Sequence, residues 1–149
     1  MIILEKSPGE VSQTELARFA RRAQKLAGVS GEVAVLITGS QQLRKLNRRY
    51  RRKDKATDVL SFPREDGGDI AISAQIAARN ALRYGHAAAD ELKILVLHGM
   101  LHLAGYDHEL DEGQMAAREA TLRKRLKLPD SLIRRGQDRA HARPRRRQP

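Results

Sequence analysis

The segment from Asp90 to Ala104 constrains the fold most strongly, because a helix over these residues would be apolar on nearly every side. Such a helix has to be buried all round, so we expect it at the centre of the domain. It carries His98 and His102, and a buried imidazole nitrogen without a partner costs about 1–3 kcal/mol. The sequence therefore predicts a central helix whose histidines share a partner.

These histidines and His108 have the spacing of a metal site. Residues four apart in an α-helix project from one face about 6 Å apart along the axis, which suits His98 and His102 as ligands of one ion. In a continued helix, His108 would lie about 240° around from His102 and about 9 Å further along, so the helix has to end between them. Gly105 stands where a left-handed residue would end the helix and let His108 turn back.

Three imidazoles around one ion, with a fourth position open, are typical of catalytic zinc. The interval also matches the zinc-protease pattern HExxHxxGxxH, except that Gly99 takes the place of the general-base glutamate. Glycine cannot accept a proton, so the pattern argues against a peptidase and leaves a Lewis-acid metal for another substrate. The competing interpretation, three unrelated histidines bonded to backbone groups, leaves their place in an apolar segment unexplained.

The rest of the chain mixes helix and strand patterns without regular β-α-β alternation or a glycine-rich phosphate loop. This favours the α+β class: a small mixed β-sheet of about four strands packed with about five helices, with the metal site on the central buried helix and the following loop. We expect a single domain over residues 1–130. Apolar spacing and capping residues (Ser12, Ser40, Ser73 and Asp111) predict helices at 13–27, 41–50, 74–84, 90–104 and from 111 towards Pro129, and strands at 2–5 on an edge, 33–38, 57–62 and 68–72.

Positive charge is concentrated in two places. The formal net charge is +11, and residues 134–149 alone hold seven arginines and one aspartate. The basic tail 131–149 has almost nothing apolar to bury, so we expect it to be disordered and either to bind phosphates or only to aid solubility. The second concentration, Arg48 to Lys55 around Tyr50, suits a polyphosphate ligand with Tyr50 stacked on an unpaired base. A solvated surface with Tyr50 packed in the core fits the same pattern.

Four carboxylates lie in segments expected near the histidines: Asp58, Asp69, Asp107 and Glu109. Each could accept a hydrogen bond from a ligand histidine, although ordinary turn or capping roles account for Asp58 and Asp69 as well.

Several classes of protein are excluded by composition. The chain has no cysteine, so thiolate metal sites and cysteine nucleophiles are ruled out. The N-terminus lacks the apolar run of a signal peptide, and no apolar stretch is long enough to span a bilayer. We expect a soluble, cytoplasmic protein with no membrane partner.

Three blocks of the sequence, HGMLHLAGYDHE, LNRRYRRKDKATDVLSFP and GDIAIS, closely resemble the YbeY family of bacterial endoribonucleases over roughly residues 30 to 125. The resemblance implies a zinc-dependent endoribonuclease specific for single-stranded RNA. It also implies a role in maturation of the 3′ end of small-subunit (16S) rRNA and in ribosome quality control. The implied partners are rRNA, the small ribosomal subunit and ribosome-associated proteins.

The resemblance also assigns residues. It places one zinc ion on His98, His102 and His108, the functionally critical arginine on Arg51, and the strongest link to activity on His98. Arg51 and His98 are thus the implied catalytic residues. The chain departs from the family at Ala56, where proline is frequent, and in its arginine-rich tail.

A second hypothesis remains open at this stage. The chain could be an RNA-binding ribosome-assembly factor in which the metal ties the helix to the following loop and catalyses nothing. Under the nuclease hypothesis, the sequence does not decide whether water or the RNA's own 2′-hydroxyl attacks the phosphate.

Overall fold

A four-stranded mixed sheet forms the base of the computed structural model, which describes residues 1–55, 57–107 and 110–129. The strand order is β1-β2-β4-β3. β1 (Ile2–Leu4) and β4 (Gly67–Ser73) pair in parallel with β2 (Glu32–Thr38), and β3 (Val59–Pro63) runs antiparallel to β4. The predicted mixed sheet is confirmed, with residues 2–4 on its edge.

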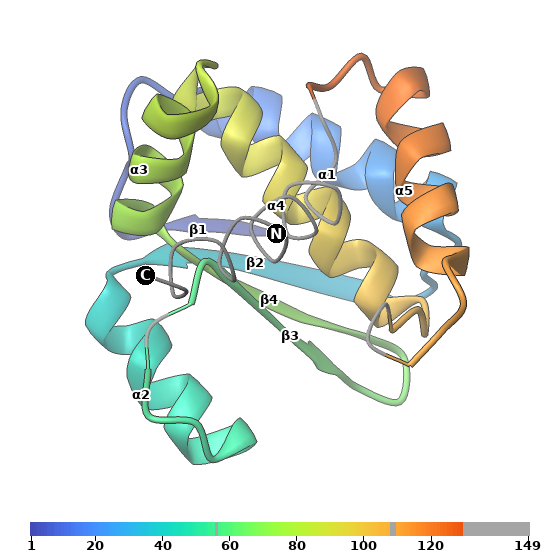
Figure 1. Ribbon diagram of the computed structural model, residues 1–149, viewed down its shortest axis with the longest axis horizontal. Helices are drawn as coiled ribbons and strands as arrows, with labels where there is room; N and C mark the ends of the chain where they lie inside the picture. The colour runs from blue at the N-terminus through green and yellow to red at the C-terminus, as the bar shows by residue number, and fades with distance from the viewer. Residues whose placement is uncertain (56, 108–109, 130–149) are drawn as a thin grey trace, which may run out of the picture.

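The helices are divided between the two faces of this sheet (Figure 1). One face carries α1 (Gln13–Ala27), α3 (Ala74–Tyr84), α4 (Ala88–Leu103) and α5 (Gln114–Arg125), and the other carries α2 (Ser40–Arg51). α4 packs against α1, α3 and α5 and against strands β3 and β4. Ten of its 16 residues are buried. The predicted central helix and α+β class are therefore confirmed.

Strand alternation gives the sheet two different faces. Val33, Val35 and Ile37 of β2 point into the main core beneath α1 and α4. A smaller core of Leu43, Leu60 and Ala71 lies under α2. Because α2 covers only part of its face, the outer surface of the sheet near β1 and β2 is left open.

Two of the four predicted helix caps are found, because the Ser12 and Ser73 hydroxyls accept hydrogen bonds from the backbone of Glu15 and Ile76. The predicted cap at Asp111 is wrong, because α5 begins later with Gly113 as its N-cap, although the Asp111 carboxylate accepts a hydrogen bond from the backbone N–H of Met115. The predicted cap at Ser40 is wrong, because Gly39 precedes the helix. The Ser40 hydroxyl lies 2.7 Å from that of Ser73 instead.

The chain beyond Pro129 lies outside the described residues, so the domain limit at residue 130 and the disorder of the tail 131–149 stay predictions. Within the part of the chain that the structure describes, no helix is both long enough and apolar enough to cross a membrane.

Candidate active site

α4 ends in a left-handed turn, as the sequence predicts. Gly105 has φ +101°, its N–H donates to the carbonyl of His102 at 3.0 Å, and the N–H of Tyr106 donates to the carbonyl of Leu101 at 3.1 Å. These are the two hydrogen bonds of a Schellman motif, and they turn the chain back over the last turn of the helix. A β-carbon at Gly105 would meet no atom within 4 Å, so the backbone conformation alone selects glycine there.

The two helical histidines lie with their rings together at this end of α4. The Nε2 atoms of His98 and His102 are 3.2 Å apart, and the ring planes meet at 74°. Two nitrogens on one tetrahedral zinc, each at 2.0–2.1 Å, would be about 3.3–3.4 Å apart. The two Nε2 atoms therefore have the separation expected of ligands on a shared ion.

The other ring nitrogen of each histidine is bonded to an oxygen. His98 Nδ1 lies 3.3 Å from Glu119 Oε2, and His102 Nδ1 lies 3.0 Å from the carbonyl oxygen of Tyr106. A carbonyl or carboxylate oxygen only accepts, so these contacts fit the tautomer in which each Nδ1 carries the proton and each Nε2 presents a lone pair to a metal. This is the tautomer that metal-binding histidines adopt when an outer acceptor orients them.

His108 and Glu109 lie outside the described residues. Across residues 1–55, 57–107 and 110–129, no three histidine, aspartate, glutamate or cysteine side chains form a group that could hold a metal. The geometry accordingly bears on His98 and His102, and the third ligand stays a prediction.

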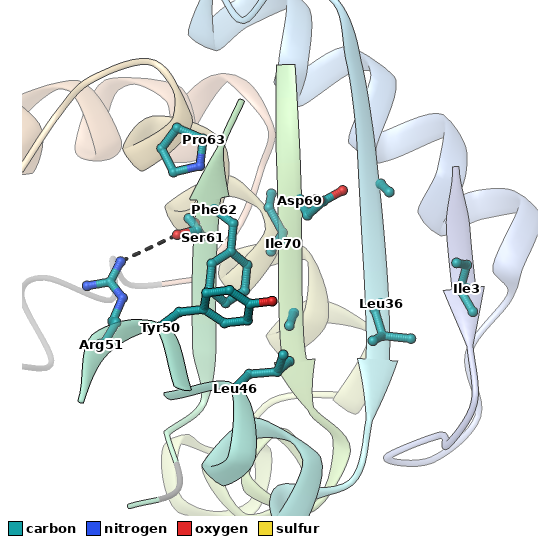
Figure 2. Close-up of a pocket in the computed structure, with 12 residues that line it drawn as sticks. Ile3, Leu36, Leu46, Tyr50, Arg51, Ser61, Phe62, Pro63, Asp69 and Ile70 are labelled. Carbon is teal, nitrogen blue, oxygen red and sulfur yellow. Dashed lines mark hydrogen bonds between the residues drawn. The ribbon is translucent and has the colours of Figure 1, made fainter. Parts of the chain in front are cut away.

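Arg51 is connected to the histidine helix through strand β3. Its Nη2 donates to the carbonyl of Ser61 at 3.4 Å (Figure 2). The Ser61 hydroxyl donates to the carbonyl of Gly99 at 3.1 Å. Gly99 directly follows His98. Arg51 and Gly99 thus both bond to Ser61 of the edge strand, although Arg51 belongs to a helix on the opposite face of the sheet.

α4 lies close to the sheet at Gly99. A β-carbon at this position would lie 2.9 Å from Cγ2 and Cδ1 of Ile70 on β4. The glutamate of the zinc-protease pattern would therefore have to displace the core, which agrees with the prediction that the chain is not a peptidase of that type.

An open groove runs along the outer face of the sheet beside α2. Ile3, Leu36, Leu46 and Phe62 supply apolar walls, and Tyr50 and Arg51 lie at the α2 side (Figure 2). Tyr50 is 58% exposed and meets the Phe62 ring edge-on at 5.3 Å. The interpretation of Tyr50 as a core residue is wrong, and its ring is accessible for stacking.

The basic run beside this groove is exposed from Arg48 to Lys55, and its one acid is Asp54. Arg44 donates to both carboxylate oxygens of Asp54, and this hydrogen bonding holds the pKa of Asp54 below its ordinary value. The loop is fixed by the Asn47 amide, which donates to the carbonyl of Lys55 at 3.0 Å. The cations of the run are exposed, and among them Arg51 lines the groove.

Comparison with known proteins identifies the family. A profile described as endoribonuclease YbeY matches residues 4–127. The chain belongs to the YbeY family. It is 59% identical to the endoribonuclease YbeY of Koribacter versatilis (strain Ellin345), with 91% of each chain covered. It is 40% identical to that of Helicobacter pylori (strain J99 / ATCC 700824), over 85% of this chain and 96% of the relative.

A solved structure supports the fold. The solution structure of TM1509 from Thermotoga maritima superposes with a TM-score of 0.55 at 28% identity, over 85% of this chain and 89% of the other. The likeness to the YbeY family begins nearer the N-terminus than the three sequence blocks indicated, since α1 is part of the matched region.

Two of the carboxylates considered as hydrogen-bond acceptors for a ligand histidine have other partners. Asp58 accepts from the side-chain amide of Asn80 at 3.4 Å, and Asp69 pairs with Arg64. For both residues, an ordinary structural role is a better interpretation than a role as acceptor for a ligand histidine. Asp107 bonds through its backbone carbonyl to the following turn.

The acceptor that His98 uses, Glu119, was missed by the sequence argument. Its side chain is 1% exposed on the inner face of α5, in line with Met115 and Leu122. A glutamate at a core position of an amphipathic helix is itself a signal, because a buried carboxylate requires a partner. That signal could have identified it.

Proposed function

We propose that this chain is a metal-dependent endoribonuclease that cuts single-stranded RNA. Family membership supports the reaction class, since the relatives carry the name endoribonuclease. The observation that carries the metal dependence is the 3.2 Å separation of the Nε2 atoms of His98 and His102, with both Nδ1 atoms bonded to oxygen acceptors.

In this proposal, zinc is held by His98, His102 and His108. The donor set fits, because imidazole nitrogens suit zinc, and nickel or cobalt accept the same ligands. When bound, the ion would act as a Lewis acid that withdraws electron density from a phosphoryl group.

The protein's own side chains bind and orient the RNA. The Arg51 guanidinium is linked through Ser61 of β3 to Gly99, the residue after His98, and would share the charge that develops on a bound phosphate. Cations at the mouth of the groove would bind neighbouring phosphates, and the exposed ring of Tyr50 would stack on an unpaired base. A duplex presents no unstacked base to Tyr50, which favours single strands.

We further propose that the cellular substrate is rRNA, with maturation of the 16S 3′ end and ribosome quality control as the roles. The small ribosomal subunit and ribosome-associated proteins would be the partners, in the cytoplasm. These assignments extend the family resemblance to this chain.

The test compares Arg51→Ala with Arg52→Ala, an exposed neighbour of equal charge. We expect Arg51→Ala to lower the cleavage rate of a single-stranded RNA by about 10²–10³, since it removes charge stabilisation at the reacting phosphate. Arg52→Ala should change the rate by less than about tenfold, because it removes only a distant phosphate contact.

Two outcomes would contradict the proposal. RNA binding without any cleavage by the zinc-loaded wild type would favour the non-catalytic assembly factor, and equal rates for Arg51→Ala and wild type would remove the arginine from the site. Product ends carrying a 2′,3′-cyclic phosphate would identify the 2′-hydroxyl as the nucleophile.

A further inference from the structure

A second basic surface lies on the face of the molecule away from the groove. It consists of Arg21, Arg22 and Lys25 on α1 together with Lys124, Arg125 and Lys127 at the end of α5, and all six residues are exposed. We name it the α1/α5 ridge. α1 and α5 lie on the side of the sheet opposite α2, so the ridge and the groove face different directions (Figure 1).

The ridge is one continuous surface, because hydrogen bonds join the two helices. Arg22 Nη2 donates to the carbonyl of Arg125 at 3.3 Å, and Arg118 Nη2 donates to the carbonyl of Leu26 at 2.9 Å. On α1, the three cations follow a helical stripe opposite the buried face of Leu16, Ala20 and Ala23.

Acidic side chains are absent from this part of the sequence. Residues 16–31 and 120–129 contain no aspartate or glutamate. The acid of α5, Glu119, is buried against His98, and Glu15 at the start of α1 pairs with Lys93 at 2.9 Å. The positive charge of the ridge is therefore not neutralised from within these helices.

The side chains of the ridge indicate which kind of partner it binds. The large exposed hydrophobic residues of the described chain are Met1, Ile3, Tyr50, Leu82 and Leu110, and none of them lies on α1 or α5. A protein interface has an apolar or aromatic centre, and single-strand sites stack bases on aromatic rings, so the ridge has the features of neither. A surface of cations alone matches a regular phosphate backbone.

We propose that the α1/α5 ridge binds the phosphate backbone of double-helical RNA, separately from the groove that holds the single strand. α5 ends at this surface, and in the sequence beyond it residues 134–149 contain seven arginines and one aspartate. A structured RNA would thus be held by its helical part on one face while an unpaired segment reaches the other. This inference goes beyond the proposed function, since it requires binding and no cleavage.

The test is the binding of a short fluorescent RNA duplex to the full chain between about 50 and 200 mM salt, followed by anisotropy. The variant Arg21→Gln, Lys25→Gln, Lys124→Gln removes three ridge cations. We expect the slope of log affinity against log salt to fall in magnitude by about 2–3, because each lost phosphate contact contributes about 0.9. Affinity at about 50 mM salt should fall at least tenfold.

The matched control is Lys6→Gln, Arg79→Gln, Arg83→Gln, which removes the same charge from exposed positions on β1's flank and α3. It should change the slope by less than about 1. Equal losses in both triple variants, or a ridge variant that binds the duplex like wild type, would overturn the proposal. Tighter, ridge-dependent binding of polyglutamate than of the duplex would also overturn it, in favour of an acidic protein partner. Because binding is the readout, an inactive protein leaves the result interpretable.

Discussion

Removal of the Glu119 carboxylate tests how His98 is prepared for a metal. Glu119 is 1% exposed and lies 3.3 Å from His98 Nδ1, so Glu119→Gln keeps an acceptor of similar size at the same place while removing the negative charge. Glu119→Leu removes the acceptor altogether and leaves a buried N–H without this partner.

The magnitude follows from these two changes. Mutation of an outer hydrogen-bond partner typically lowers metal affinity 10- to 100-fold, equivalent to about 1.4–2.8 kcal/mol. Glu119→Gln should therefore weaken zinc binding by about this amount with little effect on the stability of the metal-free protein. Glu119→Leu should weaken zinc binding further, and the unsatisfied N–H should destabilise the metal-free fold by about 1–3 kcal/mol.

The assay is a zinc titration against a competing chelator, with thermal unfolding of the metal-free proteins alongside. Glu112→Gln is the control, because Glu112 is exposed and two residues before the start of α5. Zinc affinity of Glu119→Gln equal to wild type would refute the idea that this carboxylate orients a metal ligand.

Three further outcomes follow from the local geometry. Gly105→Ala should lower stability by about 1–2 kcal/mol in chemical denaturation, since alanine is strained at φ +101° and no contact is involved; an unchanged midpoint would contradict this. Gly99→Ala should cost about 1–3 kcal/mol by pressing on Ile70, and wild-type stability would show that α4 can shift away. The hydrogen bond from Lys93 holds the pKa of Glu15 below its ordinary value. The stability that this pair contributes is therefore present above the pKa of Glu15 in the unfolded chain and is lost as pH falls through its pKa in the folded protein. Carbon NMR of Glu15 should show a higher pKa in Lys93→Met, and an unchanged pKa would contradict the pairing.

The central helix and its end were predictable because each depends on local pattern. An all-apolar helix has to lie in the core of a small domain. A glycine between two histidines predicts the left-handed turn found at Gly105. The pairing of His98 with His102 follows from helical periodicity alone.

Contacts between residues distant in sequence could not be predicted from local sequence patterns. Glu91 on α4 is fully buried, and its two carboxylate oxygens bond to His86 and Asn80. No sequence spacing predicts that these residues meet Glu91. Glu119 reaches His98 only because α5 packs on α4. The Ser40 cap was wrongly predicted for the same reason, since its hydroxyl bonds with that of Ser73 at the end of β4.

Zinc titration into metal-stripped protein, with cleavage of a single-stranded RNA as the readout, tests the account most directly. If His98 and His102 share one ion with His108, activity should rise from near zero and level off at one zinc per chain. A stripped protein that cleaves RNA as fast as the zinc-loaded form would contradict the account.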